Sequence, residues 1–287
     1  MASGTLTVGS VETNLDGQNQ VGAKTVKIAL GLPWYNGADR DCIANMLAFQ
    51  HYLGRLQERL NWIDGRDYRQ VMAENHPKLD PANTTGGSEI PHSLINTKFE
   101  FGISEEVGCS LPGLARERIV DCSIKWGADY ILFYDDDMLF GTDLFLKLYL
   151  AQKPVVAALA FTARKPITPV IYKFEKRYDE EQEHEVTDIQ PVFEYERGVL
   201  QQVDAVGTGV MLIDTSVFKK LKKPWFHSPG LGEDIYFCYQ CKTHDIPIYV
   251  HAGAQTLHKP AFADEWHSEK TYLEQYERIK NGTQVHP

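Results

Sequence analysis

The chain has 287 residues, of which 43% are hydrophobic, and its 29 Lys and Arg against 39 Asp and Glu give a formal charge of −10. This length and composition are ordinary for a globular chain and favour one large α/β domain. The acidic balance disfavours sequence-independent binding to nucleic acid, because such binding relies on Lys and Arg to neutralise phosphates. No apolar run reaches about 18 residues, so we expect no membrane-spanning helix.

The N-terminal segment and the cysteines indicate where the protein works. Residues 1–24 are polar and lack the basic start and apolar core of a signal peptide, so we expect a disordered lead-in. The five cysteines are odd in number, which fits reduced thiols in the cytoplasm. Cys238 and Cys241 form a CxxC pattern without a second pair, which favours two positions along one helix over a zinc site.

Predicted strands and helices alternate in the first half of the chain, and shorter strands cluster in the second half. Apolar runs predict strands at residues 26–32, 99–103, 130–133, 155–161, 168–174, 199–206, 209–213 and 246–251. Helical spacing predicts helices at residues 39–63, 114–125, 144–151, 216–221 and 233–244. The acidic run 178–185 predicts a solvated loop or hairpin tip. This pattern favours a mixed, mainly parallel sheet with helices on both faces.

Three acidic residues follow directly on the predicted strand 130–133, in the run Tyr134-Asp135-Asp136-Asp137. Buried unpaired charge is costly, so packing does not explain them. Ligands bind at the carboxyl ends of strands in open α/β sheets, and oxygen ligands suit Mg²⁺ or Mn²⁺. Asp135 and Asp137 can face one ligand while Asp136 faces another group, because residues two apart in an extended chain point the same way. The alternative is an acidic turn that caps a helix.

A second acidic motif, Gly232-Glu233-Asp234, opens the predicted helix 233–244. The helix dipole favours carboxylates at this end, so simple capping explains one of them. The functional alternative is that Asp234, with Glu233 beside it, acts as a general base or holds an acceptor hydroxyl. The sequence leaves both interpretations open.

Two further candidates follow predicted strands. His258 lies just beyond the last strand, and histidine is a common metal ligand. A single histidine is more often an ordinary core or surface residue, and His251 at the strand end competes for the role. Arg164, with Lys165, follows the strand 155–161, where it could hold a donor phosphate or an anionic acceptor; an ordinary surface cation is the alternative.

The order of these motifs resembles that of glycosyltransferases with the GT-A fold, in particular the family-2-like enzymes of bacteria and their phages. The resemblance covers about residues 26–260. Asp-x-Asp is a weak signal by itself, whereas the ordered set is more specific. The matching motifs, in chain order, are Pro33-x-Tyr35-Asn36, Ala115-Arg116, Asp135-x-Asp137, Gly207-x-Gly209, Gly232-Glu233-Asp234 and His258.

The resemblance implies that the first loop and one helix start contact the donor nucleotide. Pro33, Tyr35 and Asn36 match the loop that lines the nucleotide pocket, and Arg116 matches the arginine that commonly contacts the nucleotide. Glu117 stands where the family has asparagine, so the contacts of this helix start depart from the pattern.

The resemblance also implies the metal ligands and the base. Asp135 would lie near the ribose and the metal, with Asp136 counted among the donor contacts. Asp137 and His258 would hold Mn²⁺ or Mg²⁺, and Asp234 matches the catalytic base of inverting members. The acidic residue that usually reads the base has no match, because residues 64–100 depart from the pattern.

We therefore expect a cytoplasmic, metal-dependent glycosyltransferase with a single GT-A-like α/β domain. The domain would span residues 25–260, with an irregular insertion at 64–100 and a partly helical tail at 261–287. The donor would be a UDP- or GDP-linked sugar, and the acceptor a glycan, a metabolite, a protein or a modified DNA base. The alternatives are a carbohydrate-binding or degenerate relative without activity, and a nucleotidyltransferase or phosphohydrolase that uses the same carboxylates.

Overall fold

The structure is a computed structural model that describes residues 24–34, 40–62, 94, 97–179, 184–227, 230, 232–259 and 266–280. The expected lead-in and most of the expected insertion lie outside these residues, as do Tyr35 and Asn36. None of the helices in the described ranges is long and apolar enough to cross a membrane.

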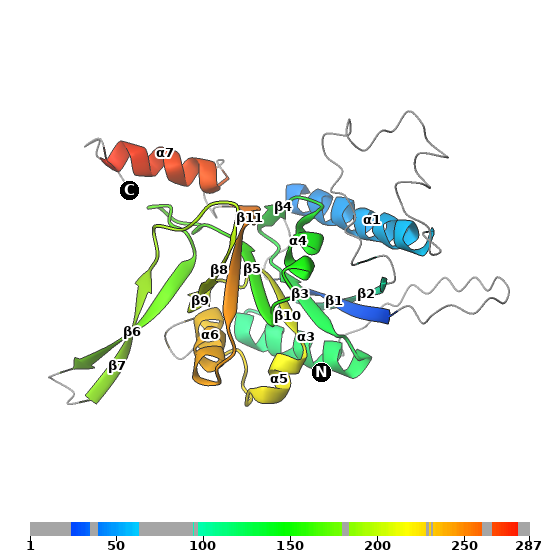
Figure 1. The fold of residues 1–287 in the computed structure, drawn as a ribbon, viewed down its shortest axis with the longest axis horizontal. Helices are drawn as coiled ribbons and strands as arrows, with labels where there is room; N and C mark the ends of the chain where they lie inside the picture. Colours follow the sequence, from blue (N-terminus) through cyan, green and yellow to red (C-terminus); the bar gives the residue numbers. More distant parts are fainter. Residues whose placement is uncertain are drawn as a thin grey trace.

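The described part of the chain is organised around an eight-stranded sheet in the order β2-β1-β3-β10-β5-β11-β4, in which β8 also pairs with β11 (Figure 1). Its strands are β1 (Lys24–Trp34), β2 (Thr97–Val107), β3 (Tyr130–Tyr134), β4 (Met138–Phe140), β5 (Val155–Leu159), β8 (Leu200–Val203), β10 (Val210–Asp214) and β11 (Ile248–His258). Strands β1, β2, β3, β5 and β11 run in one direction, and β4, β8 and β10 run against them. The predicted α/β class with a mixed, mainly parallel sheet is confirmed.

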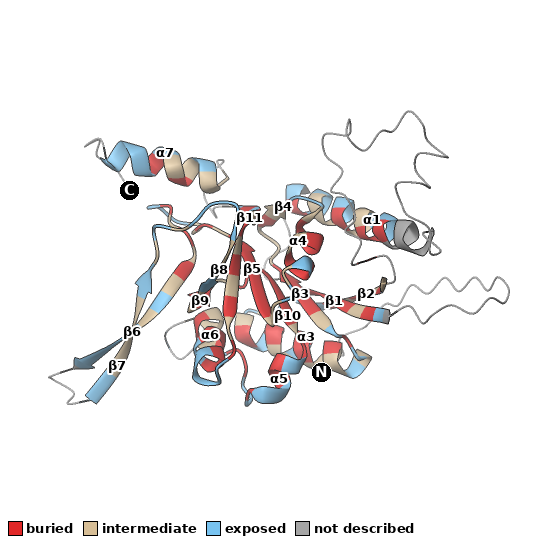
Figure 2. Ribbon diagram, in the orientation of Figure 1, coloured by how far each residue is buried: buried red, intermediate tan, exposed pale blue. Residues whose placement is uncertain are grey.

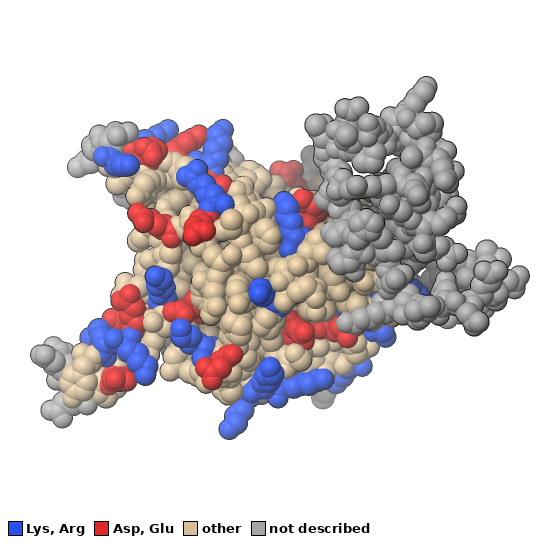
Figure 3. Space-filling view, in the orientation of Figure 1, with Lys and Arg blue, Asp and Glu red and all other residues tan. Residues whose placement is uncertain are grey.

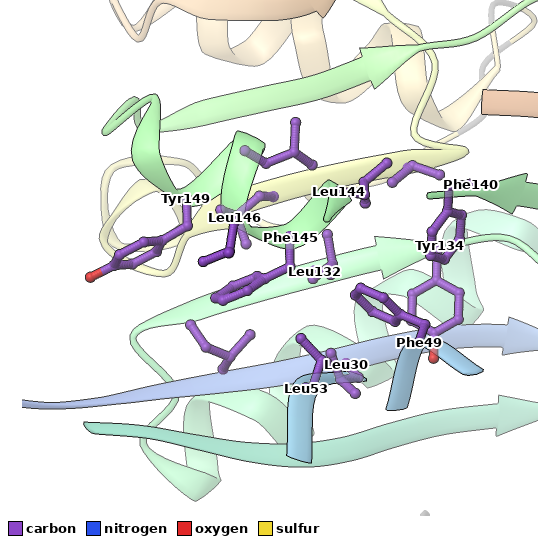
Figure 4. Close-up of a cluster of buried hydrophobic side chains, with 14 of the residues drawn as sticks. Leu30, Phe49, Leu53, Leu132, Tyr134, Phe140, Leu144, Phe145, Leu146 and Tyr149 are labelled. Atoms are coloured by element: carbon purple, nitrogen blue, oxygen red, sulfur yellow. The ribbon is translucent and has the colours of Figure 1, made fainter. Parts of the chain in front are cut away.

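Helices cover both faces of this sheet, and alternate residues of the strands contact one layer or the other. The helices are α1 (Arg40–Trp62), α3 (Pro112–Trp126), α4 (Leu144–Leu150), α5 (Ser216–Lys220) and α6 (Glu233–Thr243). Leu132 packs with residues of α1 and α4, such as Phe49 and Phe145, in the cluster drawn in Figure 4. The next residue, Phe133, packs on the opposite face with residues of α3, α5 and α6. Figure 2 shows the buried strands between the two helical layers.

A second sheet of three strands, in the order β7-β6-β9, adjoins the large one. Its strands are β6 (Ile171–Asp179), β7 (His184–Pro191) and β9 (Ala205–Val206). The β6–β7 hairpin projects from the body in Figure 1. The C-terminal helix α7 (Glu269–Lys280) packs Tyr272 on Phe161 with ring centroids 5.4 Å apart. On the face drawn in Figure 3, basic and acidic side chains are interspersed over the described part.

The structure differs from the predicted elements in the second half of the chain. The predicted strand 199–206 is two strands, because β8 pairs with β11 while β9 pairs with β6. The chain changes sheets at Asp204, whose carboxylate accepts a hydrogen bond from the Phe174 backbone N–H. Strand β7 was not predicted, because its residues are half-buried or exposed and mostly polar. Strand β11 extends to His258, past an irregularity between His251 and Gln255.

Candidate functional site

The candidate site lies at the edge of the sheet where the parallel strands β1, β3, β5 and β11 end. Pro33 is near the end of β1, Asp135 follows β3, and His258 ends β11. Phe161, two residues beyond the end of β5, contributes its backbone carbonyl to the same region. The carboxyl ends of parallel strands are where ligands bind in open α/β sheets.

Arg116 of α3 joins two acidic segments at this edge. Its Nη2 donates to both carboxylate oxygens of Asp135, at 2.9 and 3.0 Å, and its Nε lies 3.5 Å from Oε1 of Glu233. The side chain is buried and its guanidinium lies 5.4 Å from the centre of the Phe133 ring. The arginine predicted to contact the nucleotide therefore connects the turn after β3 with the start of α6.

Asp135 is held from two sides at the end of β3. Its backbone N–H donates to the Gly209 carbonyl at 2.9 Å, which continues the pairing of β3 with β10. Burial raises the pKa of its carboxyl to about 7, with a further contribution from Asp137 and against the effect of Arg116. A cation close to Asp135 would favour its ionised form, because opposite charge lowers the pKa of a carboxyl.

Asp137 and His258 meet because β4 pairs with the end of β11. Met138 is the partner of His258 in this ladder, and the Lys259 N–H donates to the Asp137 carbonyl at 2.9 Å. His258 Nε2 lies 3.2 Å from Oδ2 of Asp137, and His258 Nδ1 lies 2.6 Å from the carbonyl oxygen of Phe161. A carbonyl can only accept, so Nδ1 carries a hydrogen and Nε2 faces the carboxylate.

This arrangement suits two ligands of a divalent cation. A histidine that donates one ring N–H to a backbone carbonyl has the other nitrogen oriented for a metal, as in many metal sites. The side chain of Asp137 is 47% exposed and thus accessible. Burial lowers the pKa of His258, but its hydrogen bond to Asp137 and the charge of that carboxylate leave the pKa raised overall.

The complete ligand set stays a prediction. Among the described residues, no group of three or more His, Cys, Asp and Glu side chains is arranged to hold a metal ion. Asp137 and His258 are in contact, whereas Asp135 is bonded to Arg116. The donor chemistry of the pair, one carboxylate oxygen and one imidazole nitrogen, fits Mn²⁺ and less well Mg²⁺, which prefers oxygen.

Glu233 and Asp234 form the first turn of α6, after Gly232 in the left-handed region with φ of 85°. Oδ1 of Asp234 accepts a hydrogen bond from the Ile235 N–H at 2.7 Å. Burial, with the negative charge of Glu233, raises the pKa of Asp234. A carboxyl with a raised pKa is a stronger base once ionised, as general-base catalysis requires.

Gly207 of the predicted glycine pair lies tightly against Val170, with Asp234 nearby. A Cβ at position 207 would lie 2.9 Å from Cγ1 of Val170 and 3.6 Å from Oδ2 of Asp234. Any larger residue at Gly207 would therefore displace a neighbour beside the candidate base. Glycine at this position therefore permits the close approach of Val170 to the backbone.

A pocket opens beside the Asp-rich turn, with an empty volume of about 300 Å³ that includes space open to solvent. It is lined by Leu32, Pro33, Trp34, Cys42, Asn45, Met46, Tyr134, Asp135, Asp136, Met138 and Phe140. Three predicted nucleotide contacts, Pro33, Asp135 and Asp136, thus share one pocket. Trp34 also lines this pocket, and its Nε1 is a buried donor with no hydrogen-bond partner among the described residues.

No sequence pattern indicated several residues of this region. Asn45 of α1 donates to the Phe140 carbonyl at 2.8 Å and accepts from the Phe140 N–H at 3.2 Å, which fixes β4. The α1 residues of the pocket have the spacing of ordinary core positions. The Phe161 carbonyl that orients His258 is a backbone group, which no residue pattern specifies.

Two other candidates lie apart from these contacts. Arg164 is exposed, on a turn where its carbonyl accepts from the Thr162 hydroxyl at 2.9 Å. His251 accepts from the Gly253 N–H at 3.1 Å, and burial lowers its pKa. Of the two candidate histidines on β11, His258 is the one beside Asp137. Cys238 and Cys241 both lie on α6, as their spacing predicted, and their thiols are free and buried.

No protein-family model matches the chain, and no curated protein matches it. Solved structures share its general shape. Protein A197 from STIV aligns with a TM-score of 0.47 and 14% identity over 86% of this chain and 91% of that chain. The apo form of a UDP-glucose pyrophosphorylase aligns with a TM-score of 0.39 and 9% identity over 91% of this chain and 100% of that chain.

The structure of UDP-glucose pyrophosphorylase complexed with UDP-glucose aligns equally, with a TM-score of 0.39 and 9% identity over 90% of this chain and 99% of that chain.

Proposed function

We propose that this protein is a metal-dependent glycosyltransferase of the GT-A type that uses a nucleoside-diphosphate sugar. The observation that carries the proposal is the convergence of two acidic segments at one sheet edge. Arg116 contacts both Asp135, after β3, and Glu233, at the start of α6. The first segment faces the pocket beside β1, and the second carries the candidate base.

Each part of the site has a role in this proposal. The pocket beside Trp34 receives the nucleotide, and Asp137 with His258 holds the divalent cation. The bound cation supplies stabilisation of the negative charge that develops on the departing diphosphate. The acceptor would bind on the other side, at the start of α6, where Asp234 lies near Gly207.

The proposed sugar transfer is a single displacement at the anomeric carbon. The acceptor oxygen forms a bond to the anomeric carbon while the bond from that carbon to the diphosphate oxygen breaks. The acceptor proton goes to Asp234, and the nucleoside diphosphate leaves with the electron pair. Attack from the face opposite the leaving group inverts the anomeric configuration. The five cysteines form no disulfide within the described residues, which fits a reducing compartment, so we propose a cytoplasmic location for this activity.

The first test is isothermal titration with UDP, GDP and their sugar conjugates, each with Mn²⁺, with Mg²⁺ and with EDTA. We expect one nucleotide to bind only when metal is present. Asp137→Ala should abolish this binding, whereas Asp188→Ala, in an exposed ion pair of the β6–β7 hairpin, should leave it unchanged. No binding of any nucleotide with either metal would refute the donor site.

A second measurement separates transfer from binding alone. Release of nucleoside diphosphate from the matching sugar conjugate should occur slowly with water as acceptor and faster with a suitable hydroxyl compound. Asp234→Asn should bind the donor normally and release no product. Donor binding without any turnover in the native protein would indicate a binding protein that kept the fold. Release of a sugar phosphate would instead indicate a phosphohydrolase.

A further inference from the structure

The side chain of Glu117 on α3 binds the backbone of a segment distant in the sequence. Its Oε1 accepts hydrogen bonds from the backbone N–H groups of Trp225 and Phe226, the second at 2.7 Å. It is the residue that departs from the asparagine of the resembled family. Burial raises the pKa of its carboxyl, and these two hydrogen bonds oppose the rise.

The same short segment is held from its other side by α6. Nε2 of Gln240 donates to the Pro224 carbonyl at 2.8 Å and to the Trp225 carbonyl at 3.3 Å. The Phe226 ring stacks on Phe237 of α6, with centroids 4.8 Å apart and planes 15° apart. Residues 224–226 therefore link α3 to the helix that carries the candidate base.

The first two turns of α3 lie against both Phe226 and the start of α6. A Cβ at Gly113 would lie 2.7 Å from the Phe226 carbonyl oxygen and 3.3 Å from Cβ of Glu233. Glu117 holds Phe226, and the neighbouring Arg116 contacts Glu233. Two consecutive residues of α3 thus contact Phe226 and Glu233, the first residue of α6.

We propose that Glu117 is a positioning residue that orients the start of α6, and with it Asp234, toward the acceptor. The inference rests on the proposed function, because it assigns Asp234 the role of base. In the described part of the chain Glu117 is bonded to neither the pocket lining nor the Asp137–His258 pair, so we expect changes at Glu117 to act mainly on the acceptor side.

The kinetic test compares Glu117→Ala and Glu117→Gln with a matched control. Glu117→Ala removes the acceptor oxygen, whereas Glu117→Gln keeps one oxygen for the same N–H groups. Asp121→Asn is the control. Asp121 lies on the same helix and pairs with the Lys223 side chain at 2.6 Å, so it contacts the residue before Pro224 through a side chain and not through the backbone. Turnover of the donor and nucleotide affinity are measured for each variant.

Glu117→Ala should lower kcat by about 10²-fold, as small misplacements of catalytic groups do. Metal-dependent nucleotide affinity should stay within about twofold, because the donor side is untouched. Glu117→Gln should recover most of the rate, and the Asp121 variant should behave as the native protein. An unchanged kcat in Glu117→Ala, an equal loss of nucleotide affinity, or no recovery in Glu117→Gln would overturn the proposal. If Glu117→Ala does not fold, Glu117→Asp, with its retracted carboxylate, must show the same split.

Amide hydrogen exchange tests the inference separately from the proposed function. Tyr236 donates to the Gly232 carbonyl at 3.2 Å and closes the first turn of α6. Glu117→Ala should speed exchange at Trp225, Phe226 and Tyr236 and leave the middle of α3 unchanged. Native exchange at Tyr236 in this variant would overturn the proposal. If the native protein binds no nucleotide, the proposed function fails, and this exchange pattern still shows whether Glu117 orients α6.

Discussion

Replacing Arg116 with methionine tests the ion-pair centre of the site. The Arg116 side chain is 3% exposed, and those of Asp135 and Glu233 are 19% and 16% exposed. Removing one partner of a buried ion pair costs about 3–5 kcal/mol, because the remaining charge is left uncompensated. We expect about 3 kcal/mol at pH 7, because Asp135 can take up a proton and methionine keeps contact with Phe133.

The stability lost in the Arg116 variant should depend on pH, and the pKa of Asp135 determines whether the loss grows or shrinks as pH rises. The pKa of about 7 in the folded protein exceeds the ordinary value of 3.8. The folded state therefore keeps a proton that the unfolded state releases, so this group stabilises the fold at low pH and its contribution is lost as pH rises to about 7. Without Arg116 the pKa rises further, so the variant should lose more stability at pH 8 than at pH 5.

Urea unfolding at pH 5, 7 and 8 measures both effects as shifts of the midpoint at constant slope. Arg177→Met is the matched control, because its pair with Asp188 is exposed and should contribute less than about 1 kcal/mol. Asp135→Asn combined with the Arg116 variant should lose less than the sum of the two single changes. A loss at Arg116 no larger than at Arg177, or equal losses at all three pH values, would refute the ion-pair argument.

Three further outcomes follow from the described contacts. His258→Ala should weaken Mn²⁺ binding at least about tenfold in a metal titration, and an unchanged affinity would remove His258 from the ligand set. Because burial and Glu233 raise the pKa of Asp234, the rate of transfer should rise with pH through a midpoint above the ordinary value of 3.8; a midpoint at or below that value would contradict the assignment of the base. In native protein, iodoacetamide should label Cys109 well before Cys238 or Cys241, since the last two are buried and their thiol pKa values are raised; mass spectrometry that finds the reverse order would contradict the packing of α6.

Strands β3 and β5 of the parallel part of the sheet could be predicted from the sequence because nearly all of their residues are buried. Residues 130–133 form an unbroken apolar run, and the structure has β3 at Tyr130–Tyr134. The same holds for β5, where all five residues are buried. Since Asp135 directly follows such a strand, its place at the carboxyl edge follows from the pattern. The start of α6 was predictable for a similar reason, because Gly232 precedes two carboxylates.

The contacts between distant segments could not be predicted in this way. Asp137 and His258 are 121 positions apart, and they meet through β4, which is three residues long. A strand of that length leaves no periodic signal. The orientation of His258 depends on the Phe161 carbonyl, and backbone groups are the same at every position. The sequence therefore indicated the ligand types and left the geometry open.

Arg116 and Glu117 show why a motif match and a structure answer different questions. The match assigned Arg116 to the nucleotide, whereas the structure places it between Asp135 and Glu233, on both sides of the site. Among the described residues, Glu117 accepts its hydrogen bonds from the backbone of Trp225 and Phe226. Changes at Arg116 should therefore alter donor binding and turnover together, while changes at Glu117 alter turnover alone. Substitutions at these two adjacent residues of α3 can therefore distinguish two roles. Arg116 couples the donor side of the site to the acceptor side, and Glu117 orients the acceptor side.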